Sequence, residues 1–182
     1  MTRVAPETHD EILAAAGRRF AQTGYRGTSL QDIARDVGCS KAAVLYHFAN
    51  KEAILTGLMD RPIGQLRELD ERIAATSSPA EAQRVAANGF VDLAVRFRRE
   101  IALLRGEFPD LLQQPAFSYI QHVPERLVSA FAGHSDRPAA RIAALVVLAG
   151  IAETCGEFVD IPDAQLRSAL LALVHRALEP VN

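Results

Sequence analysis

The side chains suited to acid–base or metal chemistry do not occur at the spacings that such chemistry requires. Glu153 and Glu157 lie one helical turn apart, but two carboxylates on one helix are typical of a polar edge. His122 and Glu125 have the reverse order of the Glu-x-x-His pair of di-iron bundles, and a proline stands between them. No nucleophile elbow, phosphate-binding loop or dinucleotide fingerprint is present. We therefore expect no catalytic residues, no cofactor and no enzymatic activity.

The only two cysteines, Cys39 and Cys155, have neither a disulfide framework nor metal-ligand spacing, so we expect no metal site. We interpret Cys39 as a small apolar turn residue, with redox sensing as the alternative. The only two lysines, Lys41 and Lys51, fall in one short stretch. The net charge of the chain is −2, so charge alone does not establish nucleic-acid binding.

The elements that would position these lysines are short helices. Residues 30–49 predict two helices joined by a turn at Gly38, the arrangement of a helix-turn-helix. Ala34 is small enough for the helices to cross closely, Gly38 allows a positive φ, and Val44 is expected to point into the core. A preceding helix over residues 7–23 is expected to end at Gly24 in a left-handed cap.

Capping residues predict where the neighbouring helices begin. The second helix is expected to open at Thr28, where Thr28 and Gln31 form a capping-box pattern. Asn50 is expected to cap a fourth helix that starts at Lys51 and is interrupted at Pro62. Helical periodicity continues to the end, so we predict an all-α fold of about nine helices. The later helices are expected over residues 80–97, 98–108, 116–131, 139–158 and 163–179.

The chain shows no sign of a targeting segment or a membrane span. Its start is polar, and its longest apolar run, Ile142–Ala152, is only 11 residues long. We therefore expect a cytoplasmic protein without a membrane partner.

The segment from Gly24 to Glu52 reads GYRGTSLQDIARDVGCSKAAVLYHFANKE, and it resembles the TetR family of bacterial transcriptional regulators nearly throughout. The close match covers about residues 8–55. The resemblance implies a helix-turn-helix DNA-binding domain over residues 1–52 and a ligand-binding and dimerisation domain over residues 53–182. It further implies a repressor that binds a palindromic operator as a homodimer and is released by a small-molecule effector.

The resemblance assigns DNA contacts by position. Lys41, Ala42 and Ala43 would face bases in the major groove. Phosphates would be contacted by Thr28, Ser29, Tyr46, His47 and Lys51. The family often has an aromatic residue where Leu45 stands, and the two alanines replace glycine or threonine. We hypothesise that these alanines touch a thymine methyl and that Lys41 reads a guanine or a phosphate. The alternatives are that Tyr46 and His47 pack in the domain and that both lysines are ordinary solvated charges.

Two apolar helices are candidates for the dimer interface, because residues 142–152 are apolar all round and residues 166–177 carry an apolar stripe. The resemblance implies that both helices pair with their copies in a four-helix interface. The candidate residues are Ile142, Leu145, Val146, Ala149, Leu166, Leu170, Leu173, Val174 and Ala177.

The fourth to seventh helices would enclose the effector pocket, and an effector that shifts the fourth helix would change the spacing of the two DNA-binding domains. Candidate lining residues are Phe90, Phe97, Leu104, Phe108, Phe117, Tyr119, Ile120, His122 and Glu153. The alternative is that the aromatic residues are core, although His122 and Glu153 would need polar partners if they were buried. A DNA-binding regulator without a small-molecule ligand, controlled by a partner protein or by abundance, also remains open. A cavity in the body would discriminate between the two.

Overall fold

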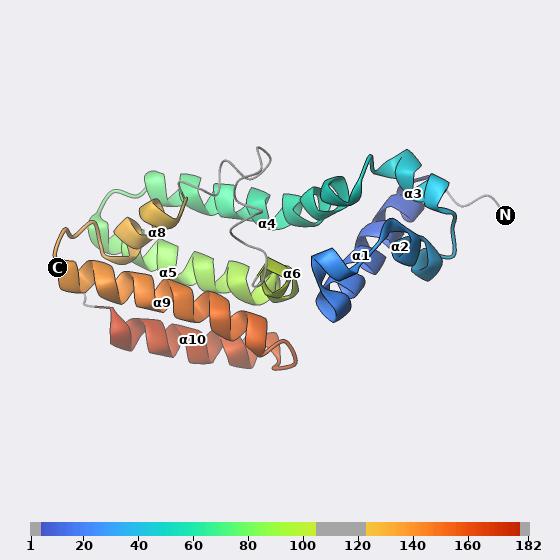
Figure 1. The fold of residues 1–182 in the computed structure, drawn as a ribbon. Helices are drawn as coiled ribbons and strands as arrows, with labels where there is room; N and C mark the ends of the chain where they lie inside the picture. Colours follow the sequence, from blue (N-terminus) through green and yellow to red (C-terminus); the bar gives the residue numbers. More distant parts are fainter. Residues whose placement is uncertain (1–4, 105–122, 179–182) are drawn as a thin grey trace. The chain divides into compact units, whose positions relative to one another are not determined.

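The computed structural model describes residues 5–104 and 123–178 of the chain, without the side chains of residues 5–7, 104 and 124. Every regular element in these residues is a helix, as Figure 1 shows, which confirms the predicted all-α fold. The helices are α1 Ala5–Gly27, α2 Leu30–Val37, α3 Lys41–His47, α4 Lys51–Ala74, α5 Pro79–Arg96, α6 Arg98–Leu104, α8 Val123–Phe131, α9 Pro138–Glu157 and α10 Asp163–Ala177.

The chain divides into two compact units, and the division falls inside α4, between Arg61 and Pro62. The sequence predicted a boundary at residue 52, but the first turns of α4 belong to the N-terminal unit because Ile54 and Leu55 are buried there. Pro62 was expected to interrupt the fourth helix, yet α4 runs through it as one helix.

The N-terminal unit is a small three-helix core to which the start of α4 is added. The crossing of α2 and α3 is as predicted, since Ala34 and Val44 are both fully buried. Gly38 closes α2 with φ 75° and ψ 31°, a left-handed conformation that favours glycine. Gly24 also has a positive φ of 76°, but its ψ of 161° kinks α1, which continues to Gly27. The predicted left-handed cap at Gly24 is therefore wrong.

The C-terminal unit is a helical body in which α10 packs against α5 and α9, while α8 packs against α5 and α9 (Figure 1). Its core includes the fully buried side chains Phe131, Ile151 and Val174. Ion pairs also join the helices on the outside. Arg167 Nε donates to Asp92 Oδ1 at 2.6 Å, which links α10 to α5, and Arg126 pairs with Asp70.

The apolar helix α9 has two different faces. Ala144, Val147, Leu148, Ile151 and Cys155 are buried in the body's own core. On the other side, the exposed fractions are 62% for Ile142, 57% for Leu145 and 64% for Val146. The helix is 20 residues long, and an 18-residue window within it has a mean hydropathy of 1.6, which is enough by length and composition to cross a membrane. The helix is therefore longer than the 11-residue apolar run in the sequence, and a core helix can pass the same test of length and composition.

The stripe predicted on the last helix divides between inside and outside. Leu166, Leu170 and Val174 are at most 3% exposed and pack into the core of the same chain. Their predicted place in a dimer interface is wrong, because they have no surface left for a partner. Leu173, at 44% exposed, and Ala177 face outward.

Candidate DNA-binding site

Helix α3 presents a mixed apolar and cationic surface. Ser40 caps its start by accepting a hydrogen bond from the Ala43 amide at 3.1 Å, and Val44 anchors the helix in the core. Lys41, Ala42, Leu45 and Tyr46 are exposed, and Tyr46 is 84% exposed. This arrangement holds one face of α3 rigidly while the other is open to a partner.

Two predicted site residues differ in accessibility from their neighbours on α3. Ala43 is half-buried, so it offers less surface than Ala42 for contact with a base. His47 is half-buried, with its ring centroid 6.3 Å from that of His9 and 5.3 Å from that of Tyr46. The alternative that Tyr46 packs inside the domain is not supported, whereas His47 does contact its own domain.

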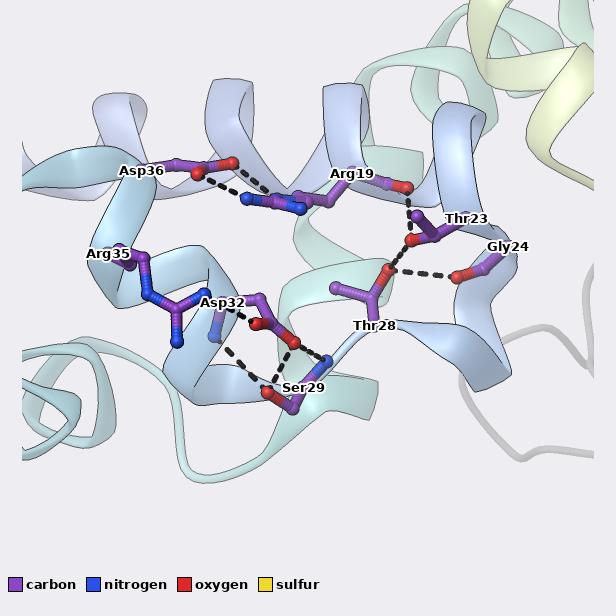
Figure 2. Close-up of polar contacts among 8 residues, drawn as sticks. All are labelled: Arg19, Thr23, Gly24, Thr28, Ser29, Asp32, Arg35 and Asp36. Carbon is purple, nitrogen blue, oxygen red and sulfur yellow. Dashed lines mark hydrogen bonds and ion pairs between the residues drawn. The ribbon is translucent and has the colours of Figure 1, made fainter.

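The start of α2 is closed by a capping box one residue later than the sequence predicted. Ser29 Oγ accepts from the Asp32 amide at 3.2 Å, and Asp32 Oδ2 accepts from the Ser29 amide at 3.1 Å (Figure 2). The Ser29 hydroxyl also donates to Asp32 Oδ2 at 2.6 Å. These hydrogen bonds from Ser29 hold the pKa of Asp32 below its ordinary value. The predicted Thr28–Gln31 box is wrong because α2 begins at Leu30.

Thr28 is 3% exposed, and its side chain serves the loop between α1 and α2. Its hydroxyl donates to the Gly24 carbonyl at 2.9 Å and lies 2.9 Å from the Thr23 hydroxyl, as Figure 2 shows. A phosphate contact through this hydroxyl would require it to leave these partners. The structure thus gives Thr28 a structural role, while Ser29 is exposed and its phosphate contact stays a prediction.

An ion pair that the sequence did not indicate joins α1 to α2. Arg19 Nε and Nη2 donate to the two carboxylate oxygens of Asp36, each at 2.6 Å (Figure 2). The Arg19 hydrogen bonds lower the pKa of Asp36, and the Asp36 carboxylate raises the pKa of Arg19. The two residues are 17 apart in sequence, so no helical spacing could have revealed the pair.

Lys51 is half-buried, and its ammonium group binds the protein backbone. Its Nζ donates to the carbonyls of Tyr25 at 2.6 Å and Thr28 at 2.8 Å. The sequence explained a cation on the first turn of a helix by a phosphate opposite it. The two carbonyl oxygens supply partial negative charge to the ammonium group from within the domain. The phosphate contact of Lys51 stays a prediction.

The structure describes the side chains of three of the residues that were predicted to line an effector pocket. Phe97 is 7% exposed, and Phe90 packs edge-on against Phe131 with ring centroids 6.1 Å apart, as core aromatics do. Glu153 is exposed, so its side chain does not line an enclosed pocket. The other predicted lining residues lie outside the described residues or, for Leu104, outside the described side chains: Leu104, Phe108, Phe117, Tyr119, Ile120 and His122.

A hollow of about 250 Å³ lies between α4 and α5, and it is not the apolar pocket that the sequence predicted. Glu68 and Arg72 line it from α4, and Asp92 and Arg96 line it from α5. None of the predicted lining residues borders this hollow.

Comparisons with known proteins agree with the architecture of both units. A profile of the family described as "Bacterial regulatory proteins, tetR family" matches residues 12–58. The transcriptional repressor KstR2 of Mycobacterium tuberculosis is 28% identical over 128 residues, which span 66% of this chain and 62% of KstR2. The transcriptional regulator TtgR of Pseudomonas putida is 36% identical over 73 residues, 40% of this chain and 33% of TtgR.

Solved structures share the fold over almost the whole chain. The TetR family regulator PfmR from Thermus thermophilus has a TM-score of 0.69 and 24% identity, covering 92% of this chain and 98% of PfmR. AibR, solved with isovaleryl coenzyme A and operator DNA, has a TM-score of 0.68 and 23% identity, covering 96% of this chain and all of AibR. Residues 12–58, in the N-terminal unit, thus match the TetR family of bacterial regulatory proteins, and the described chain shares the fold of the solved TetR family regulator PfmR.

Proposed function

We propose that the chain is a transcriptional repressor that binds a palindromic operator as a homodimer and leaves it when a small-molecule effector binds. The observation that carries this proposal is the exposed face of α3, held in a capped helix-turn-helix of the TetR family. The resemblance to KstR2, a repressor, favours repression over activation. Since its target is chromosomal DNA, the protein would act in the cytoplasm.

The chemistry of α3 suits the major groove. Ala42 and Leu45 are exposed apolar side chains that can contact a thymine methyl, and Lys41 can donate to a guanine edge or a phosphate. Tyr46 projects far enough from the domain to donate its hydroxyl to a phosphate. A helix held by its buried face and exposed on the other is what direct readout of bases requires.

Dimerisation is supported by the exposed apolar faces of α9 and α10. Ile142, Leu145 and Val146 of α9 are each more than half exposed, and Leu173 of α10 is 44% exposed. Apolar side chains gathered in this way mark a surface that is covered by a partner. A twofold interface between copies of this face would give a four-helix contact and set two α3 helices on one face of a palindrome.

The binding of a small-molecule effector is favoured by one protein of the same fold. AibR was crystallised with both isovaleryl coenzyme A and operator DNA, so one protein of this fold holds a small molecule and DNA. α4 runs from the DNA-binding unit into the body, which makes it the element that could carry a signal between them. An effector that weakens operator binding 100-fold needs a coupling free energy of about 2.7 kcal/mol.

The experiment is selection of bound duplexes from a random pool, followed by affinity measurements on the enriched sequence. We expect a palindrome with half-sites about one helical turn apart, roughly 10 base pairs, because α3 is presented by a twofold dimer. A Leu45→Ser variant should change the enriched base at one position in each half-site, while Leu178→Ser in the body should not. Recovery of no enriched sequence at low salt would contradict the proposal.

A further inference from the structure

The ammonium group of Lys51 lies in a site made by its own domain. Its Nζ is 2.6 Å from the Tyr25 carbonyl oxygen, 2.8 Å from the Thr28 carbonyl oxygen and 4.3 Å from the centroid of the Tyr25 ring. An ammonium group has three N–H donors, so two are used by carbonyls. The Tyr25 ring beneath it attracts the remaining positive charge.

The partners of Lys51 are the residues that connect α1 to α2. Tyr25 is in the last turn of α1, where its ring packs edge-on against the buried Phe20 at 5.2 Å between centroids. Thr28 is the last residue before Ser29, the N-cap of α2. Thr28 is therefore held at both ends, its hydroxyl by the Gly24 carbonyl and its own carbonyl by Lys51.

This geometry ties the first residue of α4 to the connection that precedes α2. Because Lys51 is the first residue of α4, any displacement of that turn pulls directly on the connection ahead of Ser29. The position of α2 in turn fixes α3, because Ala34 and Val44 are fully buried where the two helices cross. Lys51 is thus linked to α3 through the α1–α2 connection and α2.

We propose that Lys51 is a positioning residue, whose ammonium group fixes the α1–α2 connection to α4 and so sets the orientation of the helix-turn-helix, rather than a ligand of DNA phosphate. The proposal rests on the proposed function for its effect on DNA binding. A phosphate could recruit this ammonium group only by drawing it from the Thr28 and Tyr25 carbonyls. A movement of α4 would consequently reach the reading helix through the protein backbone.

The chain offers a matched control, because Lys41 is its only other lysine and is exposed on α3. Lys51→Met keeps the aliphatic stem over Tyr25 and removes only the charged donor, and Lys41→Met makes the same chemical change on the open surface. The affinity of each variant for the selected operator would be measured over a salt series. A lost phosphate contact makes the slope of log affinity against log salt shallower by about 0.9.

We expect Lys51→Met to bind the operator about 10-fold more weakly with the wild-type salt slope, and to bind random duplex DNA as tightly as the wild type. Lys41→Met should show the shallower slope instead. In the DNA-free protein, hydrogen exchange of the amides at Asp32 and Ile33 should be faster in Lys51→Met, with exchange in the body unchanged. Thermal unfolding and helix content verify that both variants fold. If Lys51→Met does not fold, the same measurements are made on Lys51→Gln, which is a smaller perturbation.

Either of two results would overturn the proposal. One is a salt slope for Lys51→Met that is shallower by about one unit, as for a phosphate ligand. The other is unchanged amide exchange at the start of α2. If the wild type bound no duplex at all, the proposed function would fail, but the exchange measurement would still decide the role of Lys51.

Discussion

Replacing Leu145 with alanine should separate dimerisation from folding. Leu145 lies on the outer face of α9 with 57% of its side chain exposed, and alanine keeps the helix intact. Complete burial of a leucine contributes about 1.5–3 kcal/mol, so covering the exposed part contributes roughly 1–1.5 kcal/mol per copy. A twofold interface contains two copies, and the total of about 2–3 kcal/mol corresponds to a dissociation constant raised about 30- to 150-fold.

Sedimentation equilibrium over a range of protein concentrations measures that constant directly. Leu45→Ala is the matched control, because Leu45 is 42% exposed but lies on α3 in the DNA-binding unit. We expect Leu45→Ala to dimerise like the wild type and Leu145→Ala to shift toward monomer at unchanged helix content. Equal dissociation constants for the wild type and Leu145→Ala would refute the assignment of this face to the interface.

Three further perturbations and one labelling experiment test the local physics. Ser29→Ala should destabilise the protein by about 1 kcal/mol in urea unfolding, because it removes the cap of α2. The lowered pKa of Asp32 stabilises the fold only while its carboxylate is charged. The stability difference between wild type and Asp32→Asn should therefore be present at neutral pH and disappear as the pH falls below about 3.9, and a pH-independent difference would contradict this. Gly89→Ala should destabilise the body by about 1–3 kcal/mol, because the added methyl group would overlap Leu69. Gly64→Ala is the control, since it has open space around it and should not destabilise the body. Equal shifts in the thermal unfolding of the two variants would contradict this prediction. Burial raises the pKa of Cys155 to about 11, so alkylation followed by mass spectrometry at about pH 8 should label it only after unfolding, and rapid native labelling would contradict its burial.

The helix-turn-helix could be predicted because its determinants are local. Ala34, Gly38 and Val44 each act within a few residues of their neighbours, and all three have the expected burial or backbone conformation. The capping box was displaced by one residue because Thr28 and Ser29 are both good caps. Only the tertiary partners of Thr28, which bury its hydroxyl, leave Ser29 as the cap.

Contacts between residues that are distant in sequence could not be predicted. The apolar stripe on α10 predicts which residues share a face, but only packing against α5 and α9 shows that Leu170 faces inward and Leu173 outward. Lys51 was interpreted through a resemblance, because its partners, Tyr25 and Thr28, lie 26 and 23 residues away and offer backbone atoms that side-chain chemistry does not reveal. Side-chain types thus predicted which residues form the surface of the site, but not the contacts that hold these residues in position.

The most direct test of the central claim is to change the spacing of the two half-sites in the selected operator. A homodimer that reads both half-sites with α3 needs them on one face of the DNA, so inserting about 5 base pairs turns one half-site to the opposite face. We expect the affinity to fall at least about 100-fold, toward that of random DNA, with two protomers bound to the unaltered operator. Unchanged affinity after the insertion, or one protomer per operator, would contradict the account.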